Sequence, residues 1–96
     1  MRLRSRVDNN QKEIVGAFRK LGCSVQHLHR VGEGVPDLLV GFRGGNYLVE
    51  VKSTKGKITD EQLRWFANWS TKVYIIRTID DAVDLVRLWT KLQLEI

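Results

Sequence analysis

The sequence has little cysteine, little proline and no long apolar run. Its single cysteine, Cys23, has no partner for an internal disulfide, so we expect it to pack as a small apolar side chain. No apolar stretch approaches the roughly 20 residues that cross a bilayer, and the basic N-terminus has no apolar segment behind it. These absences predict an intracellular protein without membrane association.

Basic residues, in contrast, are in excess. The 96 residues include 16 Lys and Arg against 11 Asp and Glu, which gives a formal net charge of +5. This balance favours a polyanionic partner such as DNA; an ordinary solvated surface is the alternative. The expected DNA contacts are Arg2, Arg4, Arg6, Arg30, Arg43, Lys55 and Lys57. A chain of this length fits one domain, residues 1–96.

Apolar periodicity predicts seven secondary-structure elements in the order α-β-β-β-α-β-α. The expected helices run from caps at 8–10 to about 21, from 59 to about 70, and from 78–81 to about 92. The expected strands cover 24–29, 37–42, 47–52 and 73–77. The tail 92–96 alternates with period two, which indicates an extended segment. The order predicts an α/β fold, a mixed sheet flanked by helices.

Two carboxylates lie inside the predicted central hairpin. With Gly44-Gly45 at the centre of the turn, Asp37 opposes Lys52, and Glu50 opposes Leu39. Side chains alternate with period two, so Asp37, Glu50 and Lys52 share one face and the two acids are diagonal neighbours roughly 7 Å apart at Cβ. That spacing suits one divalent cation. The alternative is a solvated pair of charges, but helices must cover both faces of so small a sheet.

The Pro36-Asp37 step, followed by Glu50-Val51-Lys52 in this frame, resembles the VRR-NUC (virus-type replication-repair nuclease) branch of the PD-(D/E)XK nucleases. The resemblance covers nearly the whole chain and implies a restriction-endonuclease-like fold. It also implies that Asp37 and Glu50 bind Mg²⁺ or Mn²⁺, with the backbone carbonyl of Val51 as a further ligand. Lys52 would then orient the attacking water or stabilise charge on the phosphate.

Glu13 and Gln62 are further candidates for this site, and each of them also has a purely structural interpretation. The resemblance implies that Glu13 completes the metal shell directly or through water, whereas the helix dipole alone favours an acid near a helix start. Gln62 forms a capping box with Thr59 by sequence, yet it lies on the apolar stripe of its helix. The segment Gln62-Leu63-Arg64-Trp65-Phe66 resembles a Gln-x-x-x-Tyr/Phe element whose glutamine contacts the active-site water shell or the substrate phosphate.

His27 and His29 have no further His or Cys at ligand spacing, so we expect polar strand residues near the substrate edge rather than a zinc site. The leading interpretation is a metal-dependent DNA endonuclease. No base-reading motif is present, which favours structure-selective cleavage of branched DNA such as Holliday junctions, by a homodimer. The alternatives are the nuclease subunit of a larger assembly and a non-catalytic nucleic-acid-binding module.

Overall fold

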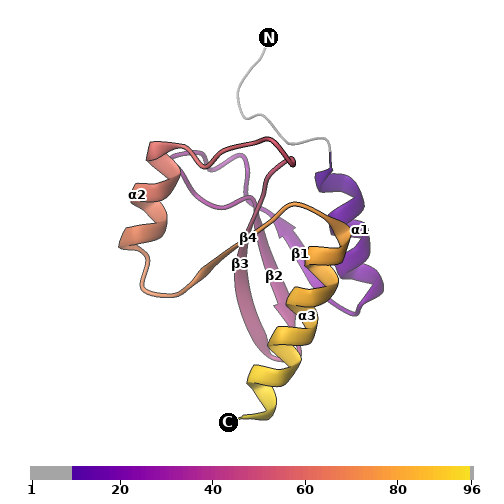
Figure 1. Ribbon diagram of the computed structural model, residues 1–96. Helices are drawn as coiled ribbons and strands as arrows, with labels where there is room; N and C mark the ends of the chain where they lie inside the picture. Colours follow the sequence, from indigo (N-terminus) through magenta and orange to yellow (C-terminus); the bar gives the residue numbers. More distant parts are fainter. Residues whose placement is uncertain (1–9, 96) are drawn as a thin grey trace.

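A computed structural model describes residues 10–95. The elements are α1 (Gln11–Lys20), β1 (Ser24–His27), β2 (Leu38–Phe42), β3 (Gly45–Val51), α2 (Asp60–Asn68), β4 (Val73–Ile76) and α3 (Ile79–Leu94). The predicted order α-β-β-β-α-β-α is confirmed (Figure 1). Among these residues, no helix has the length and apolarity needed to cross a bilayer.

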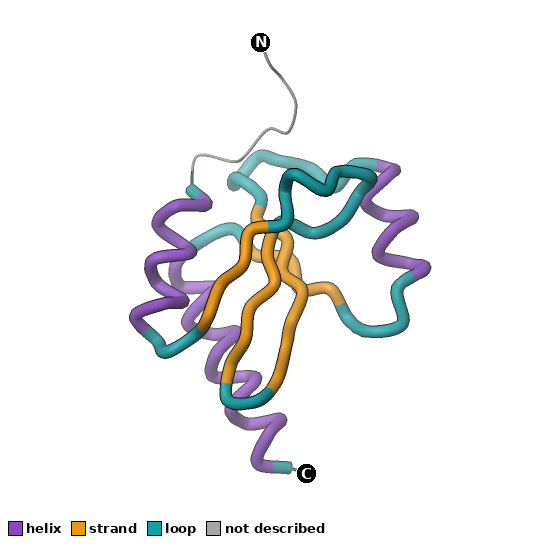
Figure 2. Tube along the Cα trace, turned by 180° about the vertical axis from the view of Figure 1, so that it is seen from behind, coloured by secondary structure: helices purple, strands orange, loops and turns teal. Residues whose placement is uncertain are grey.

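The four strands form one mixed sheet in the order β1-β2-β3-β4. The first three strands pair antiparallel, and β4 pairs parallel to β3 after the crossover through α2. Helices α1 and α3 lie together against the sheet, whereas α2 stands apart on the other side of the molecule (Figures 1 and 2). The two faces of the sheet therefore have different cover.

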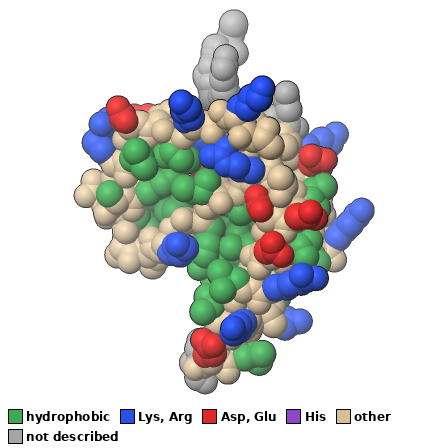
Figure 3. Space-filling model, in the orientation of Figure 1, with side chains coloured by type: hydrophobic (Ala, Val, Ile, Leu, Met, Phe, Trp, Pro, Cys, Tyr) green, Lys and Arg blue, Asp and Glu red, His purple; other side chains and the backbone are tan. Residues whose placement is uncertain are grey.

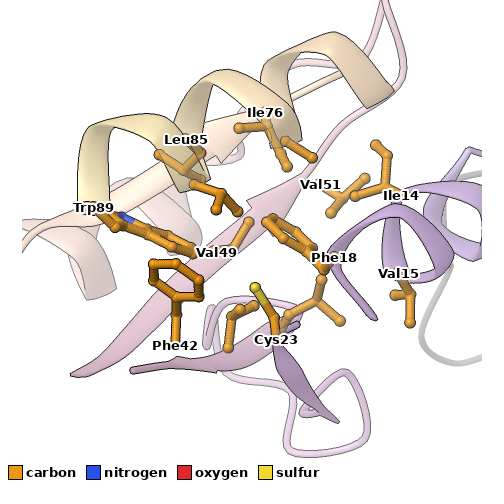
Figure 4. Close-up of a cluster of buried hydrophobic side chains, with 14 residues drawn as sticks. Ile14, Val15, Phe18, Cys23, Phe42, Val49, Val51, Ile76, Leu85 and Trp89 are labelled. Carbon is orange, nitrogen blue, oxygen red and sulfur yellow. The ribbon is translucent and has the colours of Figure 1, made fainter. Parts of the chain in front are cut away.

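The hydrophobic core lies between the sheet and the α1–α3 pair (Figure 4). Alternate strand residues point into it, among them Leu38, Val40 and Val49, all fully buried. Trp89 of α3 is fully buried at one end of this cluster, with its ring stacked on Tyr47 at 4.0 Å between centroids (Figure 4). The opposite face of β2 and β3 carries Glu50 together with the half-buried Leu39 and Leu48.

The hairpin register differs from the prediction by two residues. The turn is Arg43-Gly44, with φ of 48° and 84°, so that Phe42 pairs with Gly45 and Leu38 with Val49. A two-residue turn with positive φ at both positions matches the strand twist, which explains why this turn is formed. Because the shift is an even number, every side chain keeps its predicted face.

The C-terminal tail is also different, because α3 continues to Leu94 instead of giving way to an extended segment. Gln93 explains the extra turn: its Nε2 donates to the Phe42 carbonyl at 2.9 Å and to the Tyr47 hydroxyl at 3.0 Å. At the N-terminal helix, the expected caps at positions 8 and 9 lie outside the described residues. Leu21, expected on the apolar stripe, is 38% exposed, and Val15 is buried instead.

Candidate active site

A tight loop before β2 sets the position of Asp37. Gly34 in this loop has a φ of 84°, and a Cβ there would lie 2.6 Å from the Glu61 carbonyl oxygen at the start of α2. The Asp37 carbonyl accepts from the Leu28 N–H at 2.7 Å. The loop is thus held between α2 and the end of β1, and Asp37 enters the sheet in a fixed orientation.

The carboxylates of Asp37 and Glu50 each accept a hydrogen bond from a backbone N–H at or next to the other acid. The Asp37 N–H donates to Glu50 Oε1 at 3.2 Å, and the Val51 N–H donates to Asp37 Oδ2 at 3.0 Å. Glu50 is only 1% exposed. The corrected register thus brings the two acids directly together, closer than the diagonal spacing expected from the sequence.

The environment of Glu50 disfavours its negative charge. Burial first, and then repulsion by Asp37, raise the pKa of Glu50 to about 8. The Lys52 ammonium lies 3.6 Å from Glu50 Oε2 and acts in the opposite direction, without offsetting the other two effects. A cation between the carboxylates would remove this conflict. The oxygen-only donor set fits Mg²⁺ or Mn²⁺.

Gln62 forms the predicted cap of α2 and also contacts the acid pair. The Gln62 side-chain Oε1 accepts a hydrogen bond from the Thr59 backbone N–H at 3.0 Å. The Gln62 backbone N–H donates to Thr59 Oγ1 at 3.1 Å, which completes a capping box. Its Nε2 donates to Glu50 Oε2 at 2.9 Å. The amide therefore starts α2 and orients a buried carboxylate with different atoms of one side chain.

Lys52 lies at the end of β3, on the side of Glu50, with its side chain 14% exposed. Its backbone is fixed on both sides: its N–H donates to the Ile76 carbonyl, and its own carbonyl accepts from Asn10 Nδ2 at 3.0 Å. A lysine with a fixed backbone and a nearly buried stem can present its ammonium to an anion at the acid pair.

The sequence profile of the VRR-NUC domain matches residues 8–77. The chain belongs to the VRR-NUC family. A solved structure of a VRR-NUC domain is 31% identical, with a TM-score of 0.64, over 80% of this chain and 89% of that chain. Comparison with curated proteins gives no match. Family and fold together make this chain a nuclease-type domain, and the restriction-endonuclease-like architecture expected from the sequence is shared with the VRR-NUC structure.

Glu13 is not brought into the acid pair of this VRR-NUC domain. It is exposed on α1 and lines a cavity of about 440 Å³ beside Ser53, Thr54 and Arg77. Within residues 10–95, no three His, Cys, Asp or Glu side chains are grouped as a metal-binding set. The described part of the site therefore holds two carboxylates, both on the hairpin.

The basic residues divide between the two ends of the sheet. Arg30, Lys55 and Lys57 are exposed on loops at the end that holds the acids. Arg43 forms the hairpin turn at the opposite end and lies over the Phe42 ring at 5.0 Å. The others, Arg2, Arg4 and Arg6, lie outside the described residues.

Two positioning residues were missed by the sequence interpretation. Asn10 occupies the N-cap of α1 but makes no side-chain cap; its amide binds the carbonyls of Lys52 and Arg77 instead. The Arg77 guanidinium binds the carbonyls of Ser53 and Gly56, which holds the loop after β3. Neither role has a local sequence signal, because each joins segments more than 20 residues apart.

Proposed function

We propose that this VRR-NUC domain is a divalent-metal-dependent endonuclease that hydrolyses phosphodiester bonds in DNA. The observation that carries the proposal is the buried Asp37–Glu50 pair, with Lys52 and Gln62 both at Glu50 Oε2. A carboxylate with a strongly raised pKa next to a second acid is a common feature of functional sites.

Asp37, Glu50 and the Val51 carbonyl would hold Mg²⁺ or Mn²⁺. When bound, the ion supplies Lewis-acid polarisation of the scissile phosphate and a more acidic water. Gln62 holds Glu50 in one orientation, and Lys52 provides a positive charge for the attacking water or the phosphate. Glu13, exposed at the start of α1, would act on the metal shell through water.

The decisive experiment compares Asp37→Asn and Glu50→Gln with the unaltered chain. Labelled four-way junction, flap, duplex and single-stranded DNA are incubated with Mn²⁺, Mg²⁺ or EDTA, and metal binding is measured by calorimetry. We expect both variants to lose metal binding and cleavage and to keep their DNA affinity. Glu95→Gln, an exposed acid at the end of α3, is the matched control. Undiminished turnover in either site variant would refute the assignment, and DNA binding without any cleavage would favour the non-catalytic module.

For the substrate, we propose branched DNA such as a Holliday junction, cut by a homodimer. The exposed side of α3 supports self-association. Leu88 and Leu92 are each 41% exposed one turn apart. Exposed charged residues of the same helix are separated by sign. The acids Asp80 and Asp84 lie in its first half, and the bases Arg87 and Lys91 lie in its second half. Antiparallel packing of two copies of α3 about a two-fold axis would therefore place unlike charges opposite each other.

Light scattering at micromolar concentration tests the homodimer. We expect a dimer for the unaltered chain and a monomer for Leu88→Glu, with Leu63→Glu on α2 as the control for a similarly exposed leucine. A strictly monomeric chain that still nicks junctions would refute paired cutting but not the nuclease proposal. Dependence of all cleavage on an added protein would favour the subunit of a larger assembly.

A further inference from the structure

A second cavity lies between α1 and β1 and shares no lining residue with the acid pair. Its volume is about 440 Å³, within the range of small-molecule sites. It is lined by Gln11, Lys12, Val15, Gly16, Arg19, His27 and His29. The helix and strand that form it lie side by side in both views of the backbone (Figures 1 and 2). Because β1 is an edge strand, the cavity is open to solvent along the rim of the sheet.

The cavity contains two buried polar atoms without partners among residues 10–95. Gln11 is 2% exposed, and its Nε2 makes no hydrogen bond within this part of the chain. His29 Nδ1 is in the same situation. A buried donor without a partner is unfavourable, so a ligand acceptor at this position would remove that penalty.

The charge of the cavity has one sign. Lys12 and Arg19 are exposed at its rim, seven residues apart on one side of α1, and no Asp or Glu lines it. Arg19 also lies in the last turn of α1, where a cation is favourable on its own account. That effect does not explain Lys12 in the first turn of the helix, nor the buried amide of Gln11 beside it in the sequence. The lining therefore favours an anion.

Gly16 supplies a further, independent observation. It lies in the middle of α1, where glycine is less favourable for the helix than alanine. A Cβ at this position would meet nothing within 4 Å. Packing of the protein therefore does not require glycine here. A methyl group would instead occupy space in the cavity.

We propose that this cavity binds one nucleotide of a nucleic-acid strand. Lys12, Arg19 and Gln11 Nε2 hold its phosphate. The His27 and His29 rings, 5.7 Å apart and nearly perpendicular, offer surfaces for its base. The Leu28 N–H, between the two histidines in the sequence, donates to the Asp37 carbonyl, so the histidines and the acid pair lie at the same end of β1. A strand bound at both places would pass around that end. The inference rests on the proposed action on DNA.

The test is calorimetry in EDTA with dTMP, thymidine and inorganic phosphate, with binding of a short single-stranded oligonucleotide measured in parallel. We expect dTMP to bind, thymidine and phosphate each to bind at least tenfold more weakly, and Lys12→Ala with Arg19→Ala to reduce dTMP affinity by roughly tenfold or more. Lys20→Ala, an exposed cation of α1 outside the lining, is the matched control and should change little.

Gly16→Ala gives effects of opposite sign: the melting temperature rises, because alanine favours the helix, while dTMP affinity falls. Unchanged dTMP affinity in Gly16→Ala, or an equal loss in Lys20→Ala, would overturn the proposal. Phosphate binding as tight as that of dTMP would overturn the nucleotide assignment. These binding measurements need neither metal nor cleavage. They therefore test the nucleotide cavity even if the chain does not cleave DNA.

Discussion

Gln62 Nε2 donates a hydrogen bond to Glu50 Oε2 at 2.9 Å, and so connects the first turn of α2 to a carboxylate that is 1% exposed. No residue of α2 is itself buried. Hydrophobic side chains remain visible over α2 and along the surface below it (Figure 3). Polar contacts at its start therefore help to fix the position of this helix, together with its half-buried Trp65 and Phe66.

Separate variants distinguish the two roles of Gln62. Thr59→Ala removes the Oγ1 acceptor of the capping box but keeps the backbone N–H that donates to Gln62 Oε1. It should lower the free energy of unfolding by about 1 kcal/mol with cleavage nearly unchanged. Gln62→Glu keeps an oxygen that can accept from the Thr59 N–H, but replaces the donor to Glu50 with another acid. We expect Gln62→Glu to reduce cleavage at least tenfold and metal affinity with it. Equal cleavage by Thr59→Ala and Gln62→Glu would show that Gln62 acts only as a cap of α2 and does not support Glu50.

The stability of the metal-free protein should fall as pH rises. Burial and Asp37 raise the pKa of Glu50 from an ordinary 4.5 to about 8, so the folded state favours the protonated form. The resulting stabilisation is complete below pH 4.5 and is lost as pH rises through about 8. Thermal unfolding in EDTA from pH 5 to 9 measures it.

Glu50→Gln should reduce the change in unfolding free energy between pH 5 and pH 9 by about 1–3 kcal/mol. Glu95→Gln should leave that pH dependence as it is in the unaltered chain. Saturating Mn²⁺ should also flatten the profile for the unaltered chain, because the ion favours the ionised carboxylate. A profile that is identical for Glu50→Gln and the unaltered chain would contradict the raised pKa.

Gly34→Ala should damage both folding and cleavage. The added Cβ would lie 2.6 Å from the Glu61 carbonyl oxygen, and the residue has a φ of 84°. We expect a loss of about 2–4 kcal/mol in unfolding free energy, measured by urea denaturation. Gly32→Ala is the control, because its φ is 72° but nothing lies within 4 Å, so it should lose only about 1 kcal/mol. Equal losses would show that the contact with α2 is unimportant.

Lys52→Ala should slow the chemical step more than it weakens DNA binding. Its ammonium lies 3.6 Å from Glu50 Oε2, whereas Lys57 is exposed on the loop that follows. We expect single-turnover cleavage by Lys52→Ala to fall roughly 100-fold or more at saturating DNA. Lys57→Ala should instead weaken binding with little change in that rate. The reverse pattern would assign Lys52 to phosphate contact.

The acid face could be predicted from the sequence because its signal is local. Strand periodicity fixes which side chains share a face, and the error of two residues in register left Asp37, Glu50 and Lys52 on the same side. The capping box at Thr59 is equally local, since it spans a single helical turn. The order of elements follows from similar short-range patterns.

Contacts between distant segments were decided only by the tertiary structure. The turn formed at Arg43-Gly44, rather than at Gly44-Gly45, because backbone conformation at both residues had to suit the twist of two packed strands. Helix α3 extended to Leu94 because Gln93 found partners on the hairpin. The sequence alone determined that Asp37, Glu50 and Lys52 lie on one face of the hairpin. Burial and packing across the sheet determined how closely the two acids meet, since both depend on residues far apart in the chain.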